Sequence, residues 1–544
     1  MDQLRLILLI SISFVSLMLW EAWQKDYGPP PSPEATAAAD GGSPSTPLPT
    51  INNPGSPDGP SITSAAPVPE AQAVGPIRVT TDVLDVEISP VGGGIQRAAL
   101  RQYSAGGELG DEPYPLLDDT VARYFVYQSG LKAAAGEGPD HYARFSSNAT
   151  EYALADGEPE LKVDLVWQGA SGVTVTRTYT FKRGSYAIDV GHRVQNAGSA
   201  AWSFNAYEQL QREHQDVTQY FIQTFTGAAV STPEQRYEKF TFDDLQDTPV
   251  SLDARNGWAA ILEHYFVSAI IPAADAKAHY YSSVIDEKRY LIGYHLPEIS
   301  VAAGETATLA SRIFMGPKLQ KTLTEVAPGL ELTVDYGMLW FIGKLLYWIL
   351  DRMHALTGNW GVAIILLTCI VKGVFYPLSA AGYRSMAKMR RVQPRMVALR
   401  ERYPNDRAAL NQAMMDLYKT EKINPLGGCL PILVQIPVFI ALYWVILESV
   451  ELRQAPFIFW IHDLAAKDPW FVLPVLMTLS MWLQTRLNPA PVDPIQARVM
   501  QVMPFAFGAF FAFFPSALVL YWFVNNCLSI TQQWTITRKE ESRA

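Results

Sequence analysis

The stretch "TCIVKGVFYPL" (368–378) places a lysine inside a run of apolar residues. The run begins near residue 360 and is long enough to enter a bilayer whose hydrocarbon core is roughly 30 Å thick. A charge at such depth costs free energy, so ionisable residues inside membranes usually face the protein interior or water and mark a functional site. The fold of this region and the role of Lys372 are therefore linked questions.

Charge and hydropathy divide the 544-residue chain into two parts. Residues 1–335 contain 23 Lys and Arg against 41 Asp and Glu, a balance of −18, whereas residues 336–544 contain 20 against 12, a balance of +8. All three cysteines (369, 429 and 527) lie in the second part. An acidic part joined to a basic, apolar part indicates two environments, and a disulfide framework in the first part is excluded.

Six apolar runs are predicted to cross the membrane as a bundle of α-helices. They are 4–20, 360–378, 431–450, 471–487, and two short helices within 499–534 that are divided at "FFPSAL". No small-x-small cleavage site follows the first run, so we expect an uncleaved anchor in 1–24.

Six spans and a cytoplasmic N-terminus place 21–359 outside the cell membrane and the C-terminus inside. The segment 384–422, with ten Lys and Arg against four Asp and Glu, then lies inside, together with the tail "RKEESRA". Both placements satisfy the positive-inside rule. For the first run the alternative is a signal peptide. With a cytoplasmic N-terminus, five spans instead of six would put the basic tail outside.

The acidic part of the chain is predicted to contain a linker followed by a β domain. Residues 25–76 are rich in Pro, Ala, Gly, Ser and Thr and form a flexible linker. Within 77–330, short alternating runs recur between turns; "VTVTRTYTF" (173–181) and "YAIDVGHRV" (186–194), separated by "KRGS", predict a β-hairpin. The domain is predicted to be a large all-β sandwich.

Two helical features flank the predicted spans. The segment 331–356 contains "MLWFIGKLLYWIL", which is too short and too interrupted to span, and predicts an amphipathic helix in the membrane interface. The segment 379–424 predicts a cytoplasmic hairpin of two helices joined at "PND". This hairpin is inserted within the predicted membrane core, 357–534. We expect residues 535–544 to form a cytoplasmic tail.

The cytoplasmic hairpin offers two interpretations. Its basic residues form a solvated face near anionic lipid, or they form a docking surface for nascent chains or the ribosome. Methionines at helical spacing supply adaptable apolar contact but are most often packing residues. The candidate docking residues are Met386, Met389, Arg390, Arg391 and Met396.

Polar residues on several spans suggest a purpose for Lys372. Thr368, Lys372 and Tyr376 are four residues apart, so on one helix they share a face. Other spans contribute Gln435, Tyr521 and Asn525. One interpretation is that Lys372 snorkels to the cytoplasmic headgroups. The other is a hydrated groove, open to the cytoplasm, in which Lys372 is a fixed positive charge that shortens the path of polar segments through the membrane.

The second half resembles the YidC family of membrane protein insertases. The motifs that carry the resemblance are "YPLSAAGYRSMAKMRRVQPRM", "EKINPLGGCLPILVQIPVF", "ELRQAPFIFWIHDLAAKDP", "DPIQARVMQVMP" and "FPSALVLYW", in this order over most of 357–533. The preceding anchor, linker and β domain are similar to the Gram-negative form, whose periplasmic domain is a β-supersandwich. Five of the six spans would form the family's core.

The resemblance implies an inner-membrane insertase and chaperone that acts alone or with the Sec translocon on nascent membrane proteins. It implies a groove containing Thr368, Lys372, Gln435, Tyr521, Trp522 and Asn525 and closed to the periplasm, with substrates leaving past Ile436, Phe439 and Phe510. The family usually has arginine where this chain has Lys372, and often a second tyrosine at Trp522. Lysine keeps the charge but lacks the planar fork of arginine.

Three other classes of function have less support in the sequence. A transporter would also place polar residues in spans, but the two halves show no internal repeat. An intramembrane protease would use a Ser379–Lys372 pair, which on one helix would share a face at about 10 Å along the axis. No phosphate-binding loop and no metal-ligand spacing occurs, so we expect no enzyme activity, cofactor, metal or small-molecule substrate.

Overall fold

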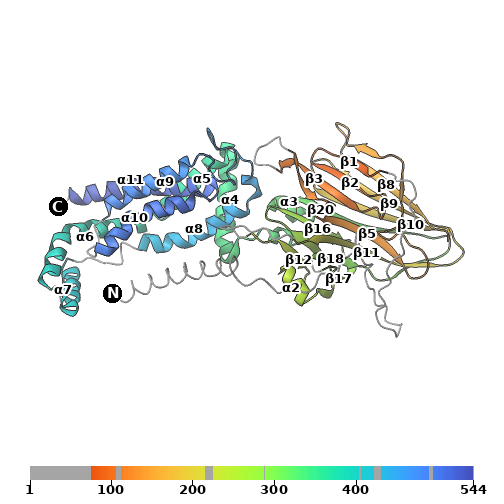
Figure 1. Ribbon diagram of the computed structural model, residues 1–544, viewed down its shortest axis with the longest axis horizontal. Helices are drawn as coiled ribbons and strands as arrows, with labels where there is room; N and C mark the ends of the chain where they lie inside the picture. The colour runs from red at the N-terminus through yellow and green to blue at the C-terminus, as the bar shows by residue number, and fades with distance from the viewer. Residues whose placement is uncertain are drawn as a thin grey trace, which may run out of the picture. The chain divides into compact units, whose positions relative to one another are not determined.

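The computed structural model describes residues 75–105, 112–121, 123–214, 224–286, 288–403, 406–421, 430–488 and 494–542. The predicted anchor and all but the last two residues of the predicted linker lie outside these ranges. Strands dominate up to residue 317 and helices from residue 320 onward, as Figure 1 shows. The predicted combination of a β domain and a C-terminal helical region is therefore confirmed.

Two sheets make up the described part of the β domain. The first has eleven strands, in the order β14 (Ser251–Arg255), β17 (Lys277–Val284), β18 (Arg289–His295), β11 (Trp202–Glu213), β5 (Phe125–Ala133), β3 (Ile95–Ser104), β2 (Leu84–Ile88), β1 (Ile77–Thr80) and β7 (Glu151–Ala153), with β19 (Ile299–Val301) on β11 and β4 (Pro113–Leu117) on β3.

The second sheet has nine strands, in the order β13 (Glu238–Phe240), β12 (Gly227–Ser231), β15 (Trp258–Leu262), β16 (Phe266–Pro272), β20 (Thr306–Pro317), β10 (Ala187–Asn196), β9 (Val173–Lys182), β8 (Glu160–Gln168) and β6 (Ser146–Ser147). Side chains from both sheets share one apolar core, which makes the domain a sandwich.

The alternation of apolar and polar residues sets the register of the central hairpin. In β9 every second side chain, from Val173 to Phe181, is buried. Strand β10 pairs with it antiparallel, with Ile188 opposite Phe181 and Asn196 opposite Val173. A slip by one residue would turn the apolar set of β9 toward the opposite face, so the pattern allows one pairing. The predicted hairpin is confirmed.

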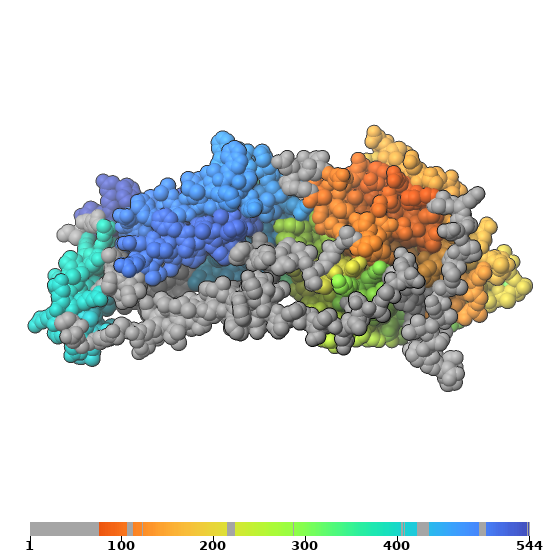
Figure 2. Space-filling view, viewed as in Figure 1, coloured from red at the N-terminus to blue at the C-terminus, as the bar shows by residue number. Residues whose placement is uncertain are grey.

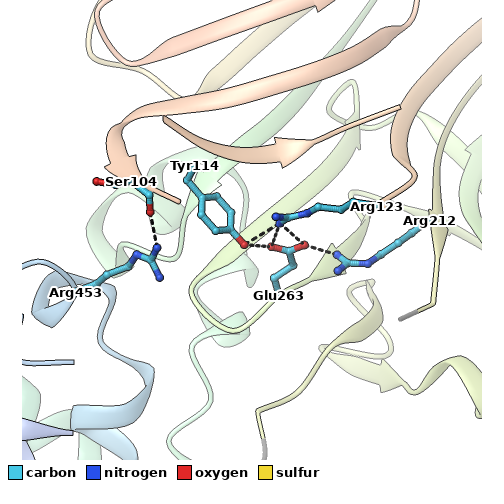
Figure 3. Close-up of polar contacts among 6 residues, drawn as sticks. All are labelled: Ser104, Tyr114, Arg123, Arg212, Glu263 and Arg453. Carbon is cyan, nitrogen blue, oxygen red and sulfur yellow. Dashed lines mark hydrogen bonds and ion pairs between the residues drawn. The ribbon is translucent and has the colours of Figure 1, made fainter. Parts of the chain in front are cut away.

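A buried carboxylate follows β15. Glu263 is 6% exposed and accepts hydrogen bonds from Tyr114 Oη at 2.8 Å and Arg212 Nη1 at 2.6 Å, and it pairs with Arg123 Nη2 at 3.4 Å (Figure 3). Burial raises the pKa of Glu263, but Arg212 and Arg123 outweigh burial, so the pKa lies below its usual value. The charged cluster ties β4, β11 and β15 together.

One short helix, α2 (Phe242–Asp247), lies within the β domain, between β13 and β14. The β domain is connected to the helical core by α3 (Gln320–Val326) and the 3-10 turns η1 (Leu330–Thr333) and η2 (Gly337–Leu339). The core helices are α4 (Trp340–Thr357), α5 (Trp360–Val374), α6 (Tyr376–Arg402), α7 (Arg407–Thr420), α8 (Leu430–Glu448), α9 (Val472–Leu487), α10 (Pro494–Phe511) and α11 (Ser516–Glu541), with the turn η4 (Val450–Leu452) after α8.

Helix α11 is central to the helical core. It packs against α5, α6 and α9, and α10 packs against α9 while α4 packs against α5 and α8. The predicted division of 499–534 into two helices is confirmed, because α10 ends at Phe511 and α11 begins after Pro515, which has no N–H to continue a helix. Helix α11 continues past residue 534 into the predicted tail.

The predicted span 360–378 is wrong in its extent. Helix α5 ends at Val374, and α6 begins at Tyr376 after a bend of 67°. Pro377 explains the bend, because a proline there lacks the N–H that would bond Gly373 and its ring clashes with that carbonyl. Tyr376 and Ser379 therefore lie beyond the bend and do not share the Lys372 face of α5. Pro394, in contrast, lies inside a continuous α6.

Within the described residues no single helix combines the length and the hydropathy needed to cross a bilayer, and one bent pair, α5 with α6, meets both conditions together.

Helix α4 has an apolar face on each side. Gly343, Leu346 and Leu350 are buried against the helical core. The large side chains Trp340, Phe341, Leu345 and Trp348 are each 57% exposed. A helix that exposes two tryptophans beside an apolar core has the character of the predicted interfacial helix.

Candidate functional site: a polar stripe on helix α11

Lys372 points from α5 toward α11. Its side chain is buried, with 8% of the residue exposed, and Nζ donates a hydrogen bond to Ser529 Oγ at 2.8 Å. The Ser529 hydroxyl in turn donates to the carbonyl oxygen of Asn525 at 2.7 Å. Among the described residues no carboxylate pairs with Lys372. The recorded partner of the Lys372 amine is therefore a neutral hydroxyl group.

Gln435 also contacts α11, at a different position along the helix. Its Nε2 donates to Tyr521 Oη at 2.8 Å, which joins α8 to α11. Tyr521, Asn525 and Ser529 are four residues apart along α11 and therefore share one face. The two ends of this face are about 12 Å apart along the helix axis. We call Tyr521, Asn525 and Ser529 the polar stripe.

The predicted groove residues differ in how they relate to the polar stripe. Lys372 and Gln435 each bond a member of it, at opposite ends. Asn525 lies between them, and its Oδ1 is buried without a hydrogen-bond partner in the described part of the chain. Thr368 is buried on α5, but its hydroxyl donates to the Ile364 carbonyl oxygen of the same helix at 2.7 Å. Thr368 is thus not bonded to the stripe.

Trp522 lies beside the stripe and joins α8 to α10. Its ring contacts Phe439 of α8 edge-on at 4.6 Å between centroids, and Phe511 of α10 at 5.3 Å. Ile436 is 45% exposed and Phe510 is 44% exposed, whereas Phe439 is partly buried. The predicted exit-face residues therefore lie on α8 and α10, and Phe439 contacts Trp522 directly.

The predicted docking residues divide into two groups. Met396 is buried with Val392, and Met389 packs on this pair from α6 while Met414, Leu417 and Tyr418 pack on it from α7. Met386 instead packs where α6 meets Ile536 of α11. These methionines are packing residues of α6. Arg390 and Arg391 are exposed, and Arg391 donates to the Glu540 carbonyl oxygen.

Figure 1 shows α7 at the end of the helical core opposite α4, and Figure 2 shows the surface of this hairpin, in teal, at the same end.

Sequence reasoning missed Ser529, the residue that receives the Lys372 ammonium. The signal was present in the spacing, because 521, 525 and 529 repeat every four residues. Reasoning also missed a second polar contact that ties α11 to α9, in which Asn526 Nδ2 donates to Ser480 Oγ at 3.2 Å. Buried polar pairs of this kind hold membrane helices together. Ser379 has 6% exposure and lies in α6, away from the recorded contact of Lys372.

Comparison with known proteins covers both parts of the chain. The family described as "YidC periplasmic domain" matches residues 76–349, and the family described as "60Kd inner membrane protein" matches residues 352–543. The chain is 48% identical over 544 residues to the "Membrane protein insertase YidC" of Methylococcus capsulatus and 46% identical over 546 residues to that of Nitrosococcus oceani, each alignment covering 99% of both chains.

A solved structure titled "Active YidC insertase crystal structure with the first transmembrane domain resolved" aligns with 85% of this chain and 92% of its own, at 19% identity and a TM-score of 0.39. The sequence relatives match this chain over its full length at nearly half identity. The chain belongs to the YidC family of membrane protein insertases.

Proposed function

We propose that the chain integrates and helps fold inner-membrane proteins, and that the polar stripe with Lys372 is where their polar segments enter the membrane. One observation carries the proposal: a buried lysine amine bonded to a hydroxyl, with no carboxylate beside it in the described residues. Such a charge is costly inside a membrane unless water or a polar partner reaches it. A client's acidic side chain would supply the missing partner.

The physical argument concerns backbone groups as well as charge. A polar segment that enters hydrocarbon leaves each unpaired N–H or C=O group at a cost of several kcal/mol. The stripe offers amide, phenol and hydroxyl groups at successive levels of α11, and the unpartnered Oδ1 of Asn525 is one of them. Such groups lower the free-energy barrier for the polar segment. The apolar part of the client then leaves past Ile436, Phe439 and Phe510 into lipid. Burial of its apolar surface, at roughly 25 cal/mol per Å², drives this step.

The finer topology belongs to the same proposal. Six spans, with both termini and the α6–α7 hairpin in the cytoplasm and the β domain in the periplasm, put the basic segments on the side that the positive-inside rule requires. The groove opens to the cytoplasm. The exposed Arg390 and Arg391 favour a ribosome contact on the hairpin, and the Sec translocon joins for some clients. The relatives are named as insertases, and we assign no catalytic residue, cofactor or metal.

Site-specific photo-crosslinking tests the entry site. A photoreactive amino acid replaces Gln435 or Tyr521 in the full chain, and inverted membrane vesicles receive a ribosome stalled on a single-span client. We expect adducts from both positions while the client's polar segment is crossing. The matched control is Arg255, on the exposed side of β14, which should give none. Adducts at Arg255 but not at 435 or 521 would contradict the proposal.

A further inference from the structure

The segment between η4 and α9 carries a stack of aromatic rings. Trp460 stacks on Phe459, with centroids 6.0 Å apart, and on Trp470, with centroids 5.9 Å apart and planes within 8° of parallel. Phe459 is 82% exposed and Trp470 is 70% exposed. The two stretches that carry the rings, "FIFW" (457–460) and "PWF" (469–471), contain no charged residue themselves; Asp463, Lys467 and Asp468 lie in the connection between them. Rings exposed in this way are unfavourable in water.

A buried carboxylate holds the stack in place. Asp468 is 1% exposed; its Oδ1 accepts hydrogen bonds from Trp460 Nε1 at 2.9 Å and from the Trp470 backbone N at 3.0 Å. Its Oδ2 accepts from the Leu473 backbone N at 2.7 Å, in the first turn of α9. The polar edge of the Trp460 indole is thus satisfied internally, which leaves an apolar outer surface.

The backbone is strained where the rings project. Phe459 has φ 54° and Phe471 has φ 57°, in the left-handed region. This conformation is unfavourable for a residue with a side chain, and bulky residues rarely adopt it. Such strain persists only where surrounding contacts fix it, and it gathers at functional positions. Here it turns two phenylalanine rings outward.

The segment is fixed to one end of the helical core. Asn359, which precedes α5, donates from Nδ2 to the Phe457 carbonyl oxygen at 3.0 Å. The backbone N of Ser516 donates to Ala466 O at 2.7 Å, and that of Ala517 donates to Leu464 O at 3.0 Å, at the start of α11. The tip therefore cannot fold away from the ends of α5, α9 and α11.

An exposed apolar stripe on α9 begins at this tip. Phe471 is 43% exposed, and Val475, Leu479 and Leu483 follow at intervals of four residues with exposures of 62%, 57% and 47%. In a membrane protein, a stripe of this kind faces lipid. Aromatic residues at the end of such a stripe mark the headgroup level, where an amphipathic ring is most stable. Helix α4, which carries the exposed Trp340 and Trp348, meets the start of α5 at this end, where His354 stacks on Trp360 at 3.9 Å.

We infer that Phe459, Trp460 and Trp470 form a second interfacial anchor, which inserts into the headgroup region of the periplasmic leaflet and, together with α4, fixes how deep this end of the core sits. Asp468 is its positioning residue. The inference rests on the proposed orientation of the chain, with the 451–470 segment on the periplasmic side. It adds a lipid contact that the insertion mechanism itself does not require.

Depth measurement with a fluorescent label tests the anchor. The three cysteines are replaced by serine, and a single cysteine is introduced as Phe459→Cys or Trp470→Cys in the full chain and labelled with NBD. The chain is reconstituted in phosphatidylethanolamine–phosphatidylglycerol liposomes. We expect lipids with a nitroxide near the headgroup to quench either label at least about threefold more than lipids with a nitroxide deep in the acyl chain, and aqueous iodide to quench it weakly. The water-facing reference is Val121→Cys, at 88% exposure in the β domain.

Two results would overturn the inference. One is iodide quenching at 459 and 470 equal to that at 121, which places the tip in water. The other is protection from iodide and from every nitroxide lipid, which places the tip against protein, such as a second copy. Insertion of a client is measured in the same liposomes, so an inactive chain with a normal depth profile would count against the proposed function and leave the anchor standing.

A matched pair of variants tests the positioning role. Asp468→Asn turns one acceptor oxygen into a donor that faces an N–H group, so the depth preference of the 459 label should fall at least about twofold. Asp463→Asn is the control, because its carboxylate accepts from the backbone N–H groups of Ala465, Ala466 and Gln454 rather than from a ring of the stack. Equal depth profiles for both variants would show that Asp468 does not position the rings.

Discussion

Arg453 and Ser104 are 349 residues apart in the chain, yet Arg453 Nη2 donates a hydrogen bond to the Ser104 carbonyl oxygen at 2.6 Å (Figure 3). The guanidinium also lies over the rings of Tyr114, Tyr265 and Phe266, at 5.3, 5.8 and 5.7 Å from their centroids. This one side chain, just after η4, joins the membrane-core part of the chain to β3, β4 and β16 of the β domain.

Replacement of Arg453 should loosen that contact. Arg453→Ala loses a charge-assisted hydrogen bond and the cation–π contacts, together worth about 2 kcal/mol. The rate of amide hydrogen exchange at the end of β3 should then rise roughly thirtyfold in the full chain. Arg453→Lys should give an intermediate rise, because lysine keeps the charge but lacks the planar guanidinium group. Arg486→Ala, which removes a guanidinium that lies over Trp482, is the control and should leave β3 unchanged.

Charge reversal at Lys372 should impair insertion selectively. Lys372→Glu places a carboxylate opposite the client's acidic residues, and a repulsion of about 1.4 kcal/mol would slow their insertion roughly tenfold. Lys372→Arg keeps the charge and should retain insertion. The measurement is insertion of single-span clients that differ in the number of acidic residues in the translocated segment, with exposed Lys388→Glu as the control. Equal insertion of acidic clients by wild type and Lys372→Glu would contradict the charge role.

Deletion of 388–419, bridged by a short Gly-Ser linker, should damage insertion without unfolding the core. The hairpin has its own small core around Val392 and Met396, whereas Ala380 and Tyr383, which pack on Ile536, remain. Insertion of a ribosome-delivered client should fall at least about fivefold, while thermal unfolding of the core is unchanged. Arg390→Gln with Arg391→Gln tests docking without loss of the hairpin core. Normal insertion by the deleted chain would refute the prediction.

The β domain should lose stability as pH rises, because of Glu208 on β11. The carboxyl group is 4% exposed, and burial raises its pKa from 4.5 to about 7. Since the native pKa lies above the unfolded one, the neutral Glu208 carboxyl group stabilises the fold fully below about pH 4.5. This stabilisation is lost as the pH rises through about 7. A shift of this size corresponds to about 3 kcal/mol.

Glu208→Gln cannot ionise and still accepts from Ser311, whose hydroxyl bonds Glu208. Hydrogen exchange of β11 and β18 in the full chain should slow in this variant at pH 8 and change little at pH 5. Glu263→Gln is the contrasting variant: its carboxylate is the charged partner of Arg212 and Arg123, so its loss should destabilise the domain at both pH values. A pH response of Glu208→Gln identical to that of wild type would contradict the assignment.

Elements with a local cause could be predicted from the residues alone. Alternation in 173–181 and 186–194 allowed a single hairpin register, and Pro515 ended one helix before the next. The exposed aromatics and buried small residues of α4 follow from its own apolar pattern. Family membership also followed from contiguous motifs, which need no tertiary contact to be read.

The contacts between polar groups depend on how the helices and strands pack. Whether Lys372 turns toward Ser529 depends on the packing of α5 against α11, and no pattern within either helix records that contact. The bend at Phe375 has a local cause in Pro377, yet its direction, and therefore the separation of Ser379 from Lys372, depends on what α6 packs against. Arg453 finds Ser104, and Asp468 collects three N–H groups, only after segments distant in the chain are brought together, because hydrogen bonds and ion pairs act over a few ångströms whatever the separation in sequence.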